Sequence, residues 1–101
     1  MGESYHRNSE TGMSNSGVLA ADTAVKSAAG KIYWLTVNDT ADMDLQLNDS
    51  TDNSGTDKWA MKLDVSVKNF GHFIFDPPIE FSTGIYLDVS TTTCQVIIGY
   101  V

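Results

Sequence analysis

The chain has 101 residues, of which 13 are acidic and 6 are basic, for a formal net charge of −7. A chain of this length forms one domain with one core, and its acidic balance argues against binding to nucleic-acid phosphates or to an anionic membrane surface. It contains no apolar run near the roughly 20 residues of a membrane span, no signal-peptide pattern and, with Cys94 alone, no internal disulfide.

The first sixteen residues are predicted to form a flexible N-terminal arm. They are rich in Ser, Asn and Gly, and Tyr5 and Met13 are their only large apolar side chains after Met1. Such a segment buries too little apolar surface to offset the entropy of ordering it. Residues 1–16 are therefore either a disordered tail or an arm that orders on a neighbouring subunit. Residues 17–101 are predicted to form a β-sandwich domain.

Two weak strand segments precede a strong one. Residues 18–21 and 24–27 are predicted to be short edge strands. Residues 31–39, "KIYWLTVND", are rich in β-branched and aromatic side chains, which favour a strand. Strict alternation puts Tyr33, Leu35 and Val37 on one face, and Ile32, Trp34 and Thr36 on the other. Both faces are largely apolar, so we expect a central strand that is covered on both sides.

Two further strands, at residues 43–48 and 58–68, alternate apolar and polar residues. Their predicted inward side chains are Met43, Leu45, Leu47, Trp59, Met61, Leu63, Val65 and Val67. The polar loop between them carries Asp49, Asp52, Asn53 and Asp57. This loop lacks the ligand spacing and the final Glu of a calcium-binding EF-hand loop, so we interpret it as a solvated hairpin tip.

The C-terminal third predicts three extended segments. A strand with Phe73 and Phe75 is expected to end at Pro77 and Pro78, because proline has no N–H for a ladder. A short piece with Ile79 and Phe81 follows. The last two strands should point Ile85, Leu87, Val89, Cys94, Val96, Ile98 and Tyr100 to one face, with Tyr86 and Asp88 outward. The closing strand is apolar on both faces and must be covered, because an uncovered one would aggregate.

Seven or eight short strands with turns every 8 to 12 residues or so are typical of an antiparallel sandwich or barrel. We therefore predict an all-β fold, an antiparallel, jelly-roll-like β-sandwich with a flexible N-terminal arm.

The sequence predicts no catalytic site, metal site or cofactor, and hence no enzyme. His6 lies in the polar tail, His72 in a turn, and Cys94 at an inward strand position, where a packed core thiol is the favoured interpretation. The aromatic residues allow two interpretations, a sugar-stacking platform or a core and subunit interface; they are Tyr33, Trp34, Trp59, Tyr86 and Tyr100.

The layout from residue 24 to residue 101 resembles small β-sandwich virion proteins of tailed bacteriophages. The resemblance lies in "AAGKIYWLTVNDTADMDLQLND", in "PPIEFSTGIYLDVSTT" and in the closing strand. It implies a capsid decoration (cement) protein that is made in the host cytoplasm, binds the major capsid protein on the virion surface and assembles as a homo-oligomer such as a trimer. The candidate interface residues are Met13, Val18, Leu19, Tyr33, Trp34, Trp59, Tyr86 and Tyr100. The alternative is a carbohydrate-binding or adhesin module of a tail or fibre.

Overall fold

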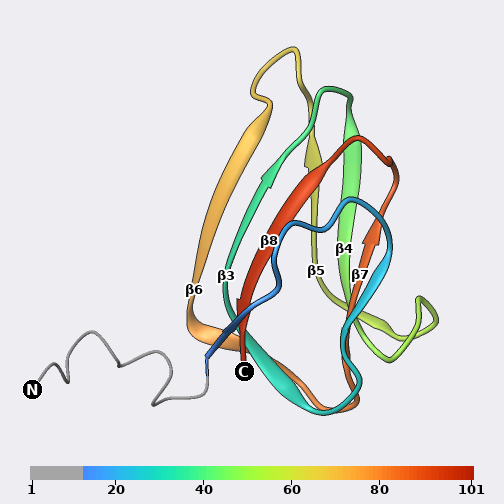
Figure 1. The fold of residues 1–101 in the computed structure, drawn as a ribbon, viewed down its shortest axis with the longest axis vertical. Coiled ribbons are helices and arrows are strands. Elements are labelled where there is room, and N and C mark those ends of the chain that lie inside the picture. The colour runs from blue at the N-terminus through green and yellow to red at the C-terminus, as the bar shows by residue number, and fades with distance from the viewer. Residues whose placement is uncertain (1–12) are drawn as a thin grey trace, which may run out of the picture.

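The computed structural model describes residues 13–101, which form eight strands and no helix, arranged in two antiparallel sheets (Figure 1). Sheet A has the order β1 (Ser14–Asn15), β8 (Gln95–Tyr100), β3 (Gly30–Asn38) and β6 (Phe70–Phe81). Sheet B has the order β2 (Thr23–Lys26), β7 (Ile85–Val89), β4 (Met43–Asp49) and β5 (Thr56–Leu63). The predicted all-β fold and strand number are confirmed, and the two sheets enclose the core as in a sandwich.

The chain runs back and forth between the two sheets. The strands form one long antiparallel ribbon whose tip is the β4–β5 hairpin in sheet B. Moving away from the tip, the successive strand pairs of the ribbon are β3–β6 in sheet A, β2–β7 in sheet B and β1–β8 in sheet A. Pairing of β3 with β8 joins two of these strand pairs into sheet A, and pairing of β4 with β7 joins the other two into sheet B. Segments far apart in sequence therefore lie side by side, which places residues of β1, β3, β6 and β8 on one outer face.

The core follows the alternation read from the sequence. Fourteen hydrophobic side chains are buried between the sheets, and the largest contributions come from β3, β4, β7 and β8. Met43, Leu45 and Leu47 point inward from β4, as predicted. The predicted inward positions of β7 and the closing segment are also buried, namely Ile85, Leu87, Val89, Cys94, Val96 and Ile98.

A bulge in β3 makes the strict alternation of that strand wrong. Ile32 pairs with Tyr100 and Trp34 with Gly99, so Tyr33 is the extra residue between them. An extra residue moves every later side chain to the opposite face. Ile32, Leu35 and Val37 therefore all point into the core, whereas Trp34 and Thr36 point outward. β3 is central in its sheet, as predicted, but its outer face is open rather than covered.

The predicted end of a strand at Pro77 and Pro78 is also wrong. β6 continues through both prolines to Phe81, and its register with β3 jumps from Ile74 to Ile79. The prolines thus lie in a bulge, where a missing N–H costs no ladder hydrogen bond.

Other strand bounds shift for local reasons. β5 ends at Leu63, and the turn that follows leaves Val67 82% exposed rather than inward. In the 18–21 segment only Leu19 bridges to Val96, whereas β2 is an edge strand as predicted. Within the segment expected to be the arm, β1 pairs with β8, and residues 1–12 lie outside the described residues.

A buried aspartate fixes a corner where the chain crosses between sheets. Asp39, which is 2% exposed, accepts hydrogen bonds from the hydroxyls of Thr91 (2.6 Å) and Thr93 (2.5 Å) and from the N–H groups of Thr40 and Ala41. Burial alone would raise the pKa of Asp39, but these hydrogen bonds outweigh it, and the pKa is lowered. The β3–β4 corner is thereby tied to the β7–β8 corner.

Candidate contact surface

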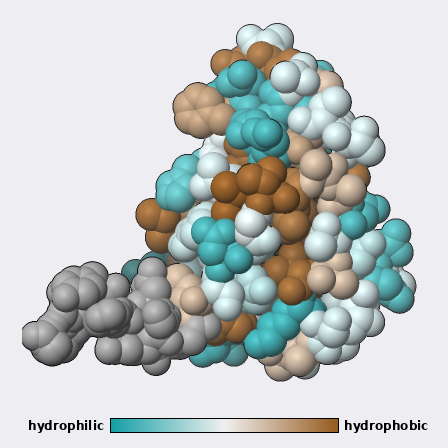
Figure 2. Space-filling model, viewed as in Figure 1, coloured by the Kyte–Doolittle hydropathy of each residue, from teal (hydrophilic) through white to brown (hydrophobic). Residues whose placement is uncertain are grey.

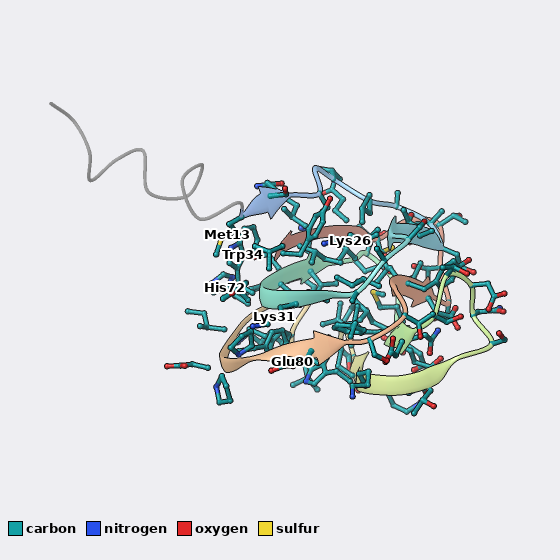
Figure 3. All side chains as sticks on the ribbon, turned by 90° about the horizontal axis from the view of Figure 1, so that it is seen from below. Met13, Lys26, Lys31, Trp34, His72 and Glu80 are labelled. Atoms are coloured by element: carbon teal, nitrogen blue, oxygen red, sulfur yellow. The ribbon has the colours of Figure 1, made fainter. Side chains whose placement is uncertain are left out.

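The outer face of sheet A carries an open groove of about 710 Å³. Its floor and walls come from three neighbouring strands, with Trp34 and Thr36 on β3, His72 and Ile74 on β6, and Ile97 on β8. Tyr33 at the bulge and Pro78 also line the groove, and Asn15 and Asp76 add polar groups to it. Figure 3 shows Trp34, His72 and Met13 on the same side of the molecule.

Backbone pairing holds the groove side chains in place. Trp34 lies directly opposite Gly99 on β8, and a Cβ at Gly99 would overlap the indole of Trp34. On the other side Thr36 is paired with His72, and its hydroxyl lies 2.7 Å from His72 Nδ1. The Trp34 and His72 rings are tilted, with centroids 6.3 Å apart. Gly99 is therefore needed at this position so that the indole can lie flat across β8.

The edge of this face exposes large apolar side chains. Ile74 is 73% exposed and Phe70 is 54% exposed, both on the outer face of β6. The ammonium group of Lys68 lies 4.8 Å above the Phe70 ring, which is a cation–π geometry. Figure 2 looks onto the edge of the sandwich, where apolar side chains gather along the middle of the view near β8, and the outer face of sheet A is turned to the left. Large exposed apolar side chains such as Ile74 and Phe70 mark a contact surface more often than a solvated one.

The outer face of sheet B has the opposite character. Asp44 and Lys62 form an exposed ion pair of 3.0 Å across β4 and β5. Tyr86 and Asp88 point outward from β7, as predicted. Burial raises the pKa of Asp88, and the nearby carboxylate of Asp22 raises it further. A charged face of this kind favours contact with water over contact with an apolar partner.

The predicted interface residues fall into three groups. Met13, Tyr33 and Trp34 lie at the groove side of sheet A. Leu19, Trp59 and Tyr100 are half-buried and pack against the core, and Trp59 lies edge-on to Phe73 and Phe75 at centroid distances of 5.0 and 5.3 Å. Val18 is 61% exposed on the loop before β2, and Tyr86 lies on the outer face of sheet B. The structure therefore does not bring the aromatic residues into one row.

Sequence reasoning missed His72, Ile74 and Phe70 as surface residues. The stretch "FGHFIF" at residues 70–75 is apolar on both faces, which signals a strand with a contact on each side. Its inner residues, Phe73 and Phe75, pack on Trp59, and two of its outer residues, His72 and Ile74, line the groove.

Residues considered for chemistry are not brought together. His72 lies on the outer face of sheet A, whereas Cys94 is buried inside, and burial raises the pKa of its thiol. Asp49 is occupied by hydrogen bonds from residues 82–84, and Asp52 by Ser54. Between residues 13 and 101, no three or more His, Cys, Asp or Glu side chains are placed to hold a metal ion.

Comparisons of the chain with protein-family models, with curated proteins and with solved structures found no match. Within residues 13–101, no helix is long and apolar enough to cross a membrane. Function is therefore inferred from the contact surface itself.

Proposed function

We propose that this protein is a virion structural protein of a tailed bacteriophage, a capsid decoration protein that binds major capsid subunits through the outer face of sheet A. The observation that carries the proposal is the contrast between the two outer faces. One holds an apolar groove around Trp34 with Ile74 exposed beside it, and the other holds charged residues such as Asp44 and Lys62. Such a molecule has one face for a protein partner and one for water.

Strand order supports a jelly roll, the finer form of the sandwich. The orders β1–β8–β3–β6 and β2–β7–β4–β5 follow when a long antiparallel ribbon folds over so that its successive strand pairs alternate between two sheets. Double-sheet jelly rolls of eight strands occur in viral capsid and lectin domains. The fold alone does not distinguish a capsid protein from a lectin, so the proposal rests on the character of the groove.

The proposed work is mechanical. A protein that binds the assembled shell better than free subunits stabilises the shell by mass action. Burial of exposed apolar side chains supplies the favourable free energy, and the acidic remainder of the surface keeps the particle soluble. No reacting group is required for this role.

Binding to capsids made of the major capsid protein from the same phage genome tests the proposal. We expect the purified chain to co-sediment with assembled capsids, to raise their disruption temperature and to bind free subunits weakly. Trp34→Ala should weaken capsid binding at least about tenfold, as truncation of an interface aromatic anchor does. The matched control is Tyr86→Ala, an aromatic truncation on the opposite outer face. Failure of the wild-type chain to bind capsids, or equal losses in both variants, would refute the proposal.

A carbohydrate-binding module is the second candidate, because the groove combines aromatic rings with hydrogen-bonding groups. Trp34 and Tyr33 could stack on a sugar, and Asn15, Thr36 and Asp76 could bind its hydroxyls. The candidate is weakened because Trp59 faces inward and Tyr86 lies on the other sheet, so the expected aromatic row is missing. A glycan array that shows binding abolished by Trp34→Ala, with no capsid binding, would favour this function.

A further inference from the structure

Three of the four sheet edges carry features that hinder pairing with another chain. β1 has two residues, and β2 has four residues with a bulge before Lys26. β5 carries Lys58 and Lys62 along its length. Short, bulged or Lys-bearing edges resist edge-to-edge association of sheets.

The first half of β6 has none of these features. Residues 70–75 contain no charged side chain and no proline. β6 pairs with β3 on one side, and within the described residues no strand lies against its other edge, the outermost strand at the left in Figure 1. Two of the exposed large hydrophobic side chains, Phe70 and Ile74, stand on this segment. An apolar edge with free backbone groups is a template for another strand.

We propose that β6 pairs with β6 of a second copy, antiparallel, about a twofold axis through His72. Phe70 and Ile74 are each two positions from His72 and share its outward face. The axis therefore places Phe70 of each copy opposite Ile74 of the other, which gives two equivalent apolar pairs. Cross-strand apolar pairs of this kind stabilise antiparallel sheets, and each removes from water two side chains that are 54% and 73% exposed in the single chain.

Charge complementarity fixes the same register. Lys68 and Asp76 are each four positions from His72, on opposite sides. Lys68 lies in the turn just before β6, which begins at Phe70, so pairing about His72 brings Lys68 of one copy to the same end of the ladder as Asp76 of the other, at both ends. The Lys68 ammonium group lies above the ring of Phe70, the residue that this register places opposite Ile74 of the second copy.

Neighbouring registers lose this match. A shift of one residue sets outward side chains against inward ones. A shift of two residues, with the axis at Phe73, sets Phe70 against Asp76 and leaves Lys68 opposite Pro78. Beyond Asp76 the ladder has to stop, because Pro77 and Pro78 have no N–H to donate. The stretch from Lys68 to Asp76 is thus complementary to itself, which is what a twofold contact requires.

The pairing joins the two A sheets into one continuous sheet, with both grooves on the same face. It is a twofold dimer, in contrast to the trimer expected from the sequence. It does not depend on the capsid assignment, because it is measured on the purified chain alone.

The molar mass of the purified chain, measured for the wild type and for variants that swap the charges of Lys68 and Asp76, tests the contact. Light scattering after size exclusion should give the mass of two chains for the wild type. Lys68→Asp and Asp76→Lys should each weaken dimerisation at least about tenfold by setting like charges opposite each other, and the double exchange should restore most of the loss. Ile74→Lys should give monomers, whereas the control Val67→Lys, at an exposed apolar site outside the strand, should stay dimeric. Circular dichroism checks that each variant is folded.

Cross-linking reports the register directly. With copper–phenanthroline as oxidant, His72→Cys should form a disulfide with its own copy across the axis, where Cα atoms of paired strands lie within bonding range. Phe70→Cys alone should not, because each Phe70 lies opposite Ile74. A monomeric wild type, a mass of three chains, or failure of the double charge exchange to restore pairing would overturn the proposal.

Discussion

The carboxylate of Asp49 at the end of β4 accepts a 3.0 Å hydrogen bond from the backbone N–H of Ser82, which follows β6. It also accepts bonds from the Ser82 hydroxyl and from the N–H groups of Thr83 and Gly84. The loop that carries the chain from sheet A to sheet B is thereby attached to the hairpin of sheet B. Asp49, which the sequence assigned to a polar loop, thus lies at the end of a strand and has a structural role.

Asp49→Asn should lower the free energy of unfolding by about 2 kcal/mol at neutral pH, because charge-assisted hydrogen bonds are lost. The N–H groups of Ser82 and Thr83 lower the pKa of Asp49 from 3.8 to about 2. A carboxyl whose pKa is lower in the folded state contributes its full stability above the unfolded value and loses it as pH falls through the folded value. The difference between wild type and variant in urea denaturation should therefore shrink from pH 4 towards pH 2. A constant difference across this range, or an equal effect of Asp57→Asn on β5, would contradict the assignment.

Asp39→Ala should destabilise the protein by roughly 2 to 3 kcal/mol, because four donors lose their buried, charged acceptor. Asp39 is 2% exposed and holds the hydroxyls of Thr91 and Thr93. The control is Asp44→Ala, which removes an exposed ion pair with Lys62 and should cost about 0.5 kcal/mol or less. Chemical denaturation of both variants provides the measurement, and similar losses would argue against the corner contact.

Truncation of Trp59 should lower the free energy of unfolding much more than truncation of Trp34, whose proposed role is in binding. Trp59→Ala removes the ring that lies against Phe73 and Phe75 and should cost about 3 kcal/mol, as truncation of packed aromatics does. Trp34→Ala, on the open face, should cost about 1 kcal/mol or less, the usual range away from the core. Thermal unfolding of both variants measures the difference, and the reverse order would contradict the inward placement of Trp59.

Cys94 should react with an aromatic disulfide reagent far more slowly in the folded protein than in concentrated guanidinium chloride. Its thiol is buried, and burial raises its pKa, so little thiolate is present or accessible. Val67→Cys places a second thiol at a position that is 82% exposed in the native protein, and in that variant one thiol should react at once while the other stays protected. Rapid reaction of the wild-type protein under native conditions would show that Cys94 is accessible.

Much of the core could be predicted from the alternation of side chains. β4 and β7 lie with one face on the core and one face outward, so the two-residue period of a strand assigns Leu45, Leu47, Ile85 and Leu87 directly. The same rule was wrong at Ile32 and Tyr33, where a bulge changes the phase. A bulge depends on what the neighbouring strands require, which a single strand's pattern does not contain.

The composition and the strand periodicity determined the fold class, the strand number and most of the inward side chains, because local side-chain alternation decides which residues can be buried together. The tertiary structure decided the rest. The ribbon-like pairing sets Trp34 over Gly99 and beside Ile74, and among residues 13–101 no strand pairs with the outer edge of the apolar first half of β6. These relationships join residues from distant parts of the chain, and their geometry exists only after the strands have paired.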